Sequence, residues 1–142
     1  MTLGFTGTQR GMSSRQVKAL RQILWCATEV HLGDCIGADA QAHEEAGHLG
    51  VRRVGHPPSI TAKRAFLHYE EERAPKPYLD RNLAIVKAGV DGLIATPKDY
   101  VEVLRSGTWA TIRAARRLNR PIWIILPNGD VKKEGHNDRP AF

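Results

Sequence analysis

The feature that most constrains the fold of this chain is a regular alternation of strand-like and helix-like segments. Short stretches typical of strands occur at residues 2–7, 29–35, 51–57, 91–97 and 121–127. Most of the segments between them carry apolar side chains at every third or fourth position, as amphipathic helices do. Strands that alternate with helices pair in parallel, because each helix returns the chain to the same end of the sheet. The sequence therefore predicts an α/β fold with a mainly parallel five-stranded sheet flanked by helices.

Two segments do not follow this alternation. Residues 57–78 contain four prolines and a dense mixture of charges, which is typical of a lid or of a flexible insertion. Residues 128–142 are polar and interrupted by Gly and Pro, and we expect a poorly ordered tail there. A chain of 142 residues has room for one domain of ordinary size. The expected layout is one domain over residues 1–127, with an insertion at 57–78, followed by the tail.

Capping residues locate two of the expected helices. Ser13 and Gln16 have the spacing of a capping box, in which each side chain bonds the backbone of the other residue. Asp80 is expected to cap the helix that follows it, and Gly89 is suited to ending that helix.

The charge of the chain favours anionic partners. The 21 Lys and Arg residues against 15 Asp and Glu give a formal net charge of +6, which suits a phosphorylated small molecule or a nucleic acid. The few aromatic residues do not interleave with basic ones, as they usually do on single-strand-binding surfaces. A solvated face, with a nucleic-acid patch as the alternative, is expected for four arginines of the last helix: Arg113, Arg116, Arg117 and Arg120.

Several other function classes lack their sequence signals. No segment approaches the roughly 20 apolar residues that span a membrane. The first residues do not have the pattern of a signal peptide, so we expect a cytoplasmic protein with no membrane partner. Cys26 and Cys35 fit no metal-ligand spacing, and the six histidines form no HExxH pair. We therefore expect neither a metal site nor a required cofactor.

Glycines and short hydroxyl residues recur where the predicted strands end. In a parallel sheet these positions meet at one edge, where ligands bind. Glycine lets a ligand approach the backbone, and the unpaired first amides of a helix attract anions. We expect a phosphate-sized site formed by Gly7, Thr8, Arg10, Gly33, Gly37, Asp39, Arg81, Asn82, Thr96, Ser106, Gly107 and Thr108.

Some of these residues also have a purely structural interpretation. Ser106 can cap its helix, and Gly107 can serve a turn. Asp39 can be an N-cap, or it can accept hydrogen bonds from ribose hydroxyls. Arg81 lies in the first turn of its expected helix, where the helix dipole disfavours a cation, and an anionic ligand would account for that placement.

Four segments, taken in order, resemble those of one known superfamily. They are FTGTQR after the first strand, GDCIGADAQAHEEA around the second helix, DRN before the third helix, and SGTWATIRAARRLNRPIWII. Together they resemble the SLOG superfamily, which includes the LOG phosphoribohydrolases, DprA and the molybdenum-cofactor carrier proteins, and most closely its small YspA- and YpsA-related branch. The resemblance covers roughly residues 3–127 and implies a single three-layer, Rossmann-like domain.

The resemblance implies a ligand of nucleotide or phosphoribosyl character, but it does not by itself imply catalysis. LOG enzymes carry a PGGxGTxxE motif whose glutamate assists glycosidic cleavage, and Thr111 stands at that position here. Glycosidic cleavage generally needs a nearby carboxylate. Of the remaining candidates, Asp34, Asp39, Asp99 and Glu102, the best catalytic residue is Asp39.

The sequence leaves three functions open. The first is a sensor, carrier or sequestering protein that binds a nucleotide-derived ligand, such as a nucleotide sugar, an ADP-ribose-type signal or a nucleotide cofactor. The second is a phosphoribohydrolase or N-glycosidase, and the third is DprA-like binding of nucleic acid. A homo-oligomer is a further expectation, in which Trp25 or Trp109 would lie at the interface unless they pack in the core.

Overall fold

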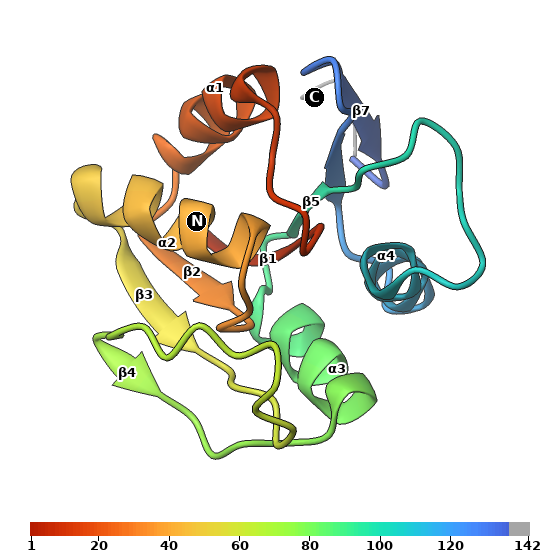
Figure 1. The fold of residues 1–142 in the computed structure, drawn as a ribbon. Coiled ribbons are helices and arrows are strands. Elements are labelled where there is room, and N and C mark those ends of the chain that lie inside the picture. Colours follow the sequence, from red (N-terminus) through yellow and green to blue (C-terminus); the bar gives the residue numbers. More distant parts are fainter. Residues whose placement is uncertain (137–142) are drawn as a thin grey trace, which may run out of the picture.

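A seven-stranded sheet runs through the protein in the computed structural model, which describes residues 1–136 (Figure 1). The strands are β1 (Thr2–Gly7), β2 (Glu29–Leu32), β3 (Arg52–Gly55), β4 (Glu71–Glu72), β5 (Leu93–Thr96), β6 (Ile122–Ile125) and β7 (Val131–Glu134). They lie in the order β4-β3-β2-β1-β5-β6-β7. All neighbours pair in parallel except β7, which is antiparallel to β6. The predicted α/β fold with a mainly parallel sheet is confirmed.

The sheet has seven strands, whereas the sequence pattern predicted five. β4 comes from the insertion, and β7 comes from the segment expected to be a poorly ordered tail. Both are edge strands rich in charged residues and largely exposed, so they lack the apolar pattern that identifies a central strand. The last part of the expected tail, residues 137–142, lies outside the described residues.

Four helices cover the two faces of the sheet, which gives three layers. They are α1 (Ser14–Leu24), α2 (Ala38–His48), α3 (Tyr78–Ala88) and α4 (Gly107–Arg117). α1 contacts α2, and α3 contacts α4. Each pair covers its own apolar core, because alternate residues of a strand point to opposite faces: Ile94 of β5 packs in the α1–α2 core, and Leu93 and Ala95 pack in the α3–α4 core.

The helix ends agree only in part with the capping predictions. The capping box is confirmed: the Ser13 hydroxyl accepts from the Gln16 N–H at 3.1 Å, and Gln16 Oε1 accepts from the Ser13 N–H at 3.0 Å. The prediction for Asp80 is wrong. α3 begins at Tyr78, with Pro77 as its N-cap, three residues before the predicted start at Arg81, and Asp80 lies in the first turn. Gly89 does end α3, with a φ of −76° that does not itself require glycine. Glycine suits this position because a Cβ there would collide with the backbone nitrogen of Gly4.

Asp34 fastens the insertion to the end of β2. Its carboxylate is fully buried and accepts hydrogen bonds from Arg64 Nε at 2.6 Å, the Leu67 N–H at 3.0 Å and the Tyr69 hydroxyl at 3.1 Å. Asp34 holds a φ of 55°, an uncommon conformation that these bonds offset. The contacts fix residues 64–69 against the sheet, so this part of the insertion does not behave as a detached lid.

Candidate anion-binding cavity

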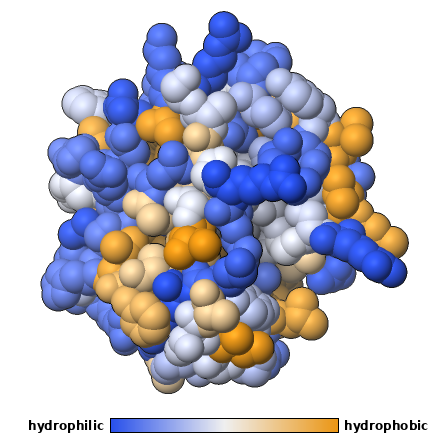
Figure 2. Space-filling view, in the orientation of Figure 1, coloured by the Kyte–Doolittle hydropathy of each residue, from blue (hydrophilic) through white to orange (hydrophobic). Residues whose placement is uncertain are grey.

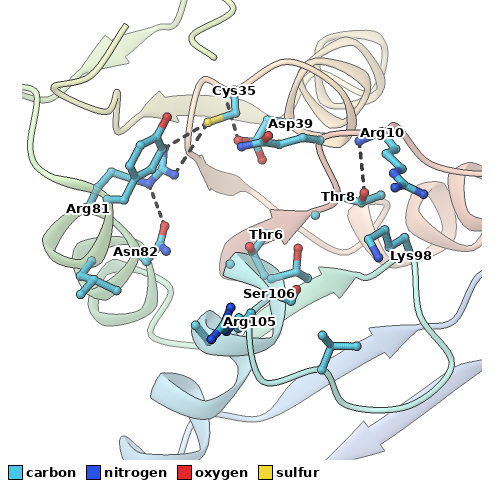
Figure 3. A pocket seen from close by; sticks show the side chains of 18 residues that line it. Thr6, Thr8, Arg10, Cys35, Asp39, Arg81, Asn82, Lys98, Arg105 and Ser106 are labelled. Carbon is cyan, nitrogen blue, oxygen red and sulfur yellow. Dashed lines mark hydrogen bonds between the residues drawn. The ribbon is translucent and has the colours of Figure 1, made fainter. Parts of the chain in front are cut away.

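A cavity of about 500 Å³ lies beyond the carboxyl ends of β1 and β5 (Figure 3). The chain leaves β1 toward β2 on one side of the sheet, and it later returns to place β5 on the other side. The loops after β1 and β5 therefore diverge and leave a crevice between them, as doubly wound sheets do at such a point. The volume is in the range of small-molecule sites.

The first turn of α4 forms one wall of the cavity. Ser106 is the N-cap of α4, and its hydroxyl accepts from the Trp109 N–H at 3.2 Å. No group within residues 1–136 accepts a hydrogen bond from the N–H of Gly107 or Thr108, and both residues line the cavity. A Cβ at Gly107 would meet nothing within 4 Å, so the space beside it is open. Two free amides at the positive end of a helix are suited to an anion.

Residues 97–106, between β5 and α4, extend this wall outward. Lys98, Val103 and Arg105 of the segment line the cavity, whereas Val101 and Leu104 are 73% and 83% exposed. Figure 2 shows apolar side chains at the right-hand edge of the molecule, where Figure 1 places the segment between β5 and α4. The α4 side of the cavity is therefore loosely packed at its outer rim.

The loop after β1 forms the floor of the cavity. The Thr8 hydroxyl accepts from the Arg10 N–H at 3.1 Å, and the Thr8 carbonyl accepts from the Ala38 N–H of α2 at 2.9 Å. The Thr8 N–H in turn donates to the Thr96 carbonyl at the end of β5 at 3.1 Å. These bonds tie the loop to α2 and to β5, and they hold Arg10 at the cavity.

Asp39 supplies a buried carboxylate to the opposite wall. It lies at the second position of α2, after Gly37 as N-cap, so the N-cap interpretation is wrong. Its Oδ2 accepts from the Cys35 N–H at 3.1 Å. Burial raises the pKa of Asp39 to about 6, and the nearby Arg81 guanidinium partly offsets that rise. The carboxyl group therefore titrates close to neutral pH, a property typical of functional sites.

Arg81 is held rigidly beside Asp39. The residue is 6% exposed, and Nη1 donates to the Gly33 carbonyl and, at 3.4 Å, to the His56 carbonyl. Nε donates to Asn82 Oδ1 at 2.8 Å. Within residues 1–136 these partners are all neutral, and no carboxylate lies within ion-pair distance of Arg81. Arg81 interacts electrostatically with the nearby Asp39 carboxyl group but forms no ion pair with it, so its guanidinium can still interact with an anion in the cavity.

Cations outnumber carboxylates around the cavity. Arg10, Arg81, Lys98 and Arg105 line it, and Asp39 is the one carboxylate among its lining residues. In Figure 3, Arg81 and Asn82 lie at the left of the cavity, and Arg10 and Lys98 lie at the right. Lys98 forms an ion pair with Asp99 at 3.1 Å, which reduces the contribution of Lys98 to the positive charge of the cavity. The cavity nevertheless carries net positive charge, which attracts anions.

Most of the residues predicted to bind a ligand line this cavity: Gly7, Thr8, Arg10, Asp39, Arg81, Asn82, Ser106, Gly107 and Thr108. Gly33, Gly37 and Thr96 do not. A Cβ at Gly33 would lie 2.6 Å from Arg81 Nη1 and 2.9 Å from Asp39 Oδ2, so this glycine makes room for the side chains of Arg81 and Asp39. Gly37, at a φ of 86°, packs against the Gln9 backbone. Thr96 is fully buried beside Gly7.

Several lining residues were not predicted: Thr6, Gln9, Cys35, Tyr78, Leu79, Lys98, Val103, Arg105 and Ala110. Thr6, Gln9, Cys35 and Arg105 adjoin predicted residues in the sequence, so a wider window around each loop would have found them. Lys98 lies two residues after the predicted Thr96, and whether it faces the cavity depends on the path of residues 97–106. Tyr78 was assigned to the end of the insertion, and it is the first residue of α3.

The other candidate carboxylates have structural partners. Asp34 binds the insertion, as described above, and Glu102 forms ion pairs with Arg113 at 3.0 Å and Arg116 at 2.8 Å. Asp99 pairs with Lys98. The Thr111 hydroxyl donates to the Gly107 carbonyl within α4 at 2.9 Å, and Thr111 does not line the cavity. Asp39 therefore remains the candidate for acid–base chemistry.

Three of the four arginines predicted for the last helix are engaged in contacts within the protein, and one of them, Arg120, lies beyond the end of α4 at Arg117. Arg116 pairs with Glu134 of β7 at 2.8 Å as well as with Glu102. Arg120 donates to the carbonyls of Val86 and Lys87 at 3.2 and 3.1 Å. Trp109 of the same helix is buried in the core, and Trp25 is 76% exposed.

A metal site needs a group of ligating side chains, and a membrane-spanning segment needs a long apolar helix. Among the described residues, no group of three or more His, Cys, Asp and Glu side chains is arranged to hold a metal ion. Likewise, none of the helices in residues 1–136 is long and apolar enough to cross a membrane.

Comparison with known proteins identifies similar folds but no close relative. No protein-family model matches the chain, and no curated protein matches it. The X-ray structure of TM1055, a structural genomics target, matches with a TM-score of 0.62 at 15% identity, over 85% of this chain and 71% of that one. DNA processing protein A from Helicobacter pylori, in a structure described for its single-stranded DNA binding mode, matches with a TM-score of 0.61 at 18% identity.

That second match covers 87% of this chain and 64% of the Helicobacter protein, so this chain spans less than two thirds of its length. At such identities the likeness establishes the fold alone. The resemblance to the SLOG superfamily and to its YspA- and YpsA-related branch rests on the sequence segments quoted above and stays a prediction.

Proposed function

We propose that this protein binds a phosphorylated small molecule derived from a nucleotide, with a phosphate at the N-terminus of α4. The observation that carries the proposal is the pair of free amides at Gly107 and Thr108, which line a cavity that also holds four cationic side chains. Amides at a helix start and nearby guanidinium groups are the usual partners of a phosphate. Asp39 and Asn82, on the opposite wall, would contact the organic part of the ligand.

The proposal predicts that Gly107→Asp abolishes binding without destabilising the free protein. The new carboxylate would occupy the open space beside the free amides and repel a phosphate, and we expect at least a hundredfold loss of affinity. An acidic residue in the first turn suits the helix dipole, so the melting temperature without ligand should stay the same or rise slightly. The measurement is native mass spectrometry of purified protein, followed by a thermal-shift screen against nucleotides, nucleotide sugars and ADP-ribose species.

Gly50→Asp is the matched control. Gly50 lies just after the C-terminal end of α2 and has a φ of 69°. As at Gly107, a Cβ at this position would meet nothing within 4 Å. Asp tolerates this conformation better than most residues, so a small loss of stability and unchanged binding are expected. No co-purifying mass and no stabilisation of the wild type by any compound would contradict the proposed function.

Binding of single-stranded nucleic acid is the second candidate. The observations that favour it are the net charge of +6 and the likeness of fold to DNA processing protein A, whose structure is described for single-stranded DNA binding. The cavity cations would then hold a backbone phosphate in place of a small molecule.

Salt dependence separates the two candidates. A nucleic acid that contacts several basic side chains would lose affinity steeply between 50 and 200 mM salt, by about a thousandfold or more for six to ten phosphate contacts. A small ligand seated on the α4 amides would lose much less. Arg117→Glu, on the exposed side of α4, should weaken binding of an oligonucleotide that uses this helix and leave the small ligand unaffected.

Hydrolysis of the bound nucleotide is the enzymatic alternative, and Asp39 is the residue on which it would depend. Asp39→Asn separates binding from catalysis: loss of turnover with retained affinity would establish an N-glycosidase, and absence of turnover in the wild type would leave a binding protein. The assay follows release of free base from nucleoside monophosphates.

A further inference from the structure

The Asn82 side chain has a fixed orientation, and this orientation follows from Arg81. A guanidinium Nε can only donate a hydrogen bond, so the atom of Asn82 that lies 2.8 Å from it must be the amide oxygen. Arg81 cannot swing away, because its Nη1 is bonded to the Gly33 and His56 carbonyls in a buried position. The amide nitrogen of Asn82 therefore lies on the side away from Arg81, as Figure 3 shows.

The amide nitrogen of Asn82 has no partner among residues 1–136, although Asn82 lines the cavity. Asn82 therefore presents its two N–H donors to whatever occupies the cavity, while its oxygen is engaged by Arg81. On the same side, Asp39 Oδ2 is bonded to the Cys35 N–H, and the other carboxylate oxygen remains to accept. This wall thus has a donor at Asn82 and an acceptor at Asp39, both held by buried neighbours.

We propose that Asn82 is a specificity-determining residue, which donates a hydrogen bond from Nδ2 to an acceptor oxygen or nitrogen on the organic part of a phosphate ester. The inference rests on the proposed function, because it assumes a phosphate on the α4 amides. It adds that the site distinguishes an organic phosphate from inorganic phosphate by means of this donor. A hydrogen-bonding site rejects ligands that lack the matching group, since its own polar group would then be left unpaired.

The test compares two variants that affect Arg81 differently. Asn82→Asp keeps an oxygen acceptor for Arg81 Nε and removes the N–H donors. Asn82→Leu removes both hydrogen-bonding ends at similar volume and without a new charge. Isothermal titration gives the dissociation constants of AMP, ribose 5-phosphate and inorganic phosphate for each protein. The ratio of organic to inorganic phosphate affinity cancels the general repulsion that the Asp carboxylate exerts on every anion.

We expect both variants to lose roughly threefold to tenfold in this ratio, which is the usual net effect of one lost neutral hydrogen bond. If Asn82→Asp keeps the ratio of the wild type and Asn82→Leu loses it, Asn82 acts by positioning Arg81, and the inference is overturned. It is overturned as well if the wild type binds organic phosphates no more tightly than inorganic phosphate, and in that case the proposed phosphate site stands. If none of the three probes binds the wild type, both the proposed function and the inference fail.

Discussion

The two walls of the cavity are built in opposite ways. On the α2–α3 wall, Asp39 and Arg81 are buried, and backbone groups of neighbouring loops hold both side chains. On the α4 wall, Gly107 faces open space, its amide has no partner within residues 1–136, and the adjoining segment exposes Leu104. One wall is fixed before any ligand arrives, and the other has free hydrogen-bonding capacity.

If a ligand binds as proposed, this difference predicts how substitutions on each wall would affect stability and binding. A buried carboxylate and a buried guanidinium cost stability, and a chain retains them where function requires them. Free amides at the start of an exposed helix cost little, because water satisfies them when no ligand is present. We therefore expect changes on the α2–α3 wall to alter stability as well as binding, and changes on the α4 wall to alter mainly binding.

The largest expected contrast is between two glycines. Gly33→Ala should lower the free energy of unfolding by roughly 3 kcal/mol, because the new methyl group would overlap Arg81 and Asp39 in a packed interior. Gly107→Ala should change it by less than about 0.5 kcal/mol, because the space beside it is open. Urea denaturation of the two variants measures the contrast. Equal losses would show that the two walls do not differ as described.

The next effect is the stability cost of Asp39. Its pKa in the folded protein is raised to about 6 from an ordinary 3.8, so the folded state binds the proton more tightly than the unfolded state. Its contribution to stability is therefore full below pH 3.8 and declines as the pH rises to about 6. Asp39→Asn should be more stable than wild type by about 3 kcal/mol at pH 8, since the pKa rises by about two units and one pKa unit corresponds to about 1.4 kcal/mol.

This advantage of Asp39→Asn should shrink as the pH falls below 6 and disappear near pH 4. The measurement is denaturant unfolding of both proteins across this range. Comparing variant with wild type removes the contribution of His31 and His56, whose pKa values are lowered by burial and whose effect on stability has the opposite sign. A difference that does not change with pH would mean that Asp39 is not a strained ionisable group.

The smallest effect is expected for Ser106→Ala on the α4 wall. Loss of the N-cap hydrogen bond to the Trp109 N–H should cost about 1 kcal/mol of stability. Ser13→Ala is the matched control, because it removes the cap of α1 at a similar cost. Thermal unfolding compares the two variants, and only Ser106→Ala should also weaken ligand binding. Equal binding by both variants would show that Ser106 serves α4 and not the ligand.

The sequence predicted the central part of the fold because the central elements are the ones with strong local signals. β1, β2, β5 and β6 are largely buried and apolar, and the capping box at Ser13 is a local pattern. The edge strands β4 and β7 were missed, because pairing at an edge needs little burial and leaves charged side chains exposed. The start of α3 was placed too late, because Pro77 was attributed to the insertion and because Asp, the residue at position 80, is a common N-cap residue.

What the sequence by itself determined is the set of loops that meet at one edge of a parallel sheet, since the ends of the central strands follow from local patterning. Only the tertiary structure decided what each side chain does there. Gly33 and Asp34 adjoin each other in the sequence, yet one makes room for Arg81 and Asp39, and the other binds the insertion. Arg81 is held by the carbonyls of Gly33 and His56, which follow β2 and β3, and it in turn orients the Asn82 amide. Such roles depend on contacts between residues far apart in the chain, and no local pattern encodes them.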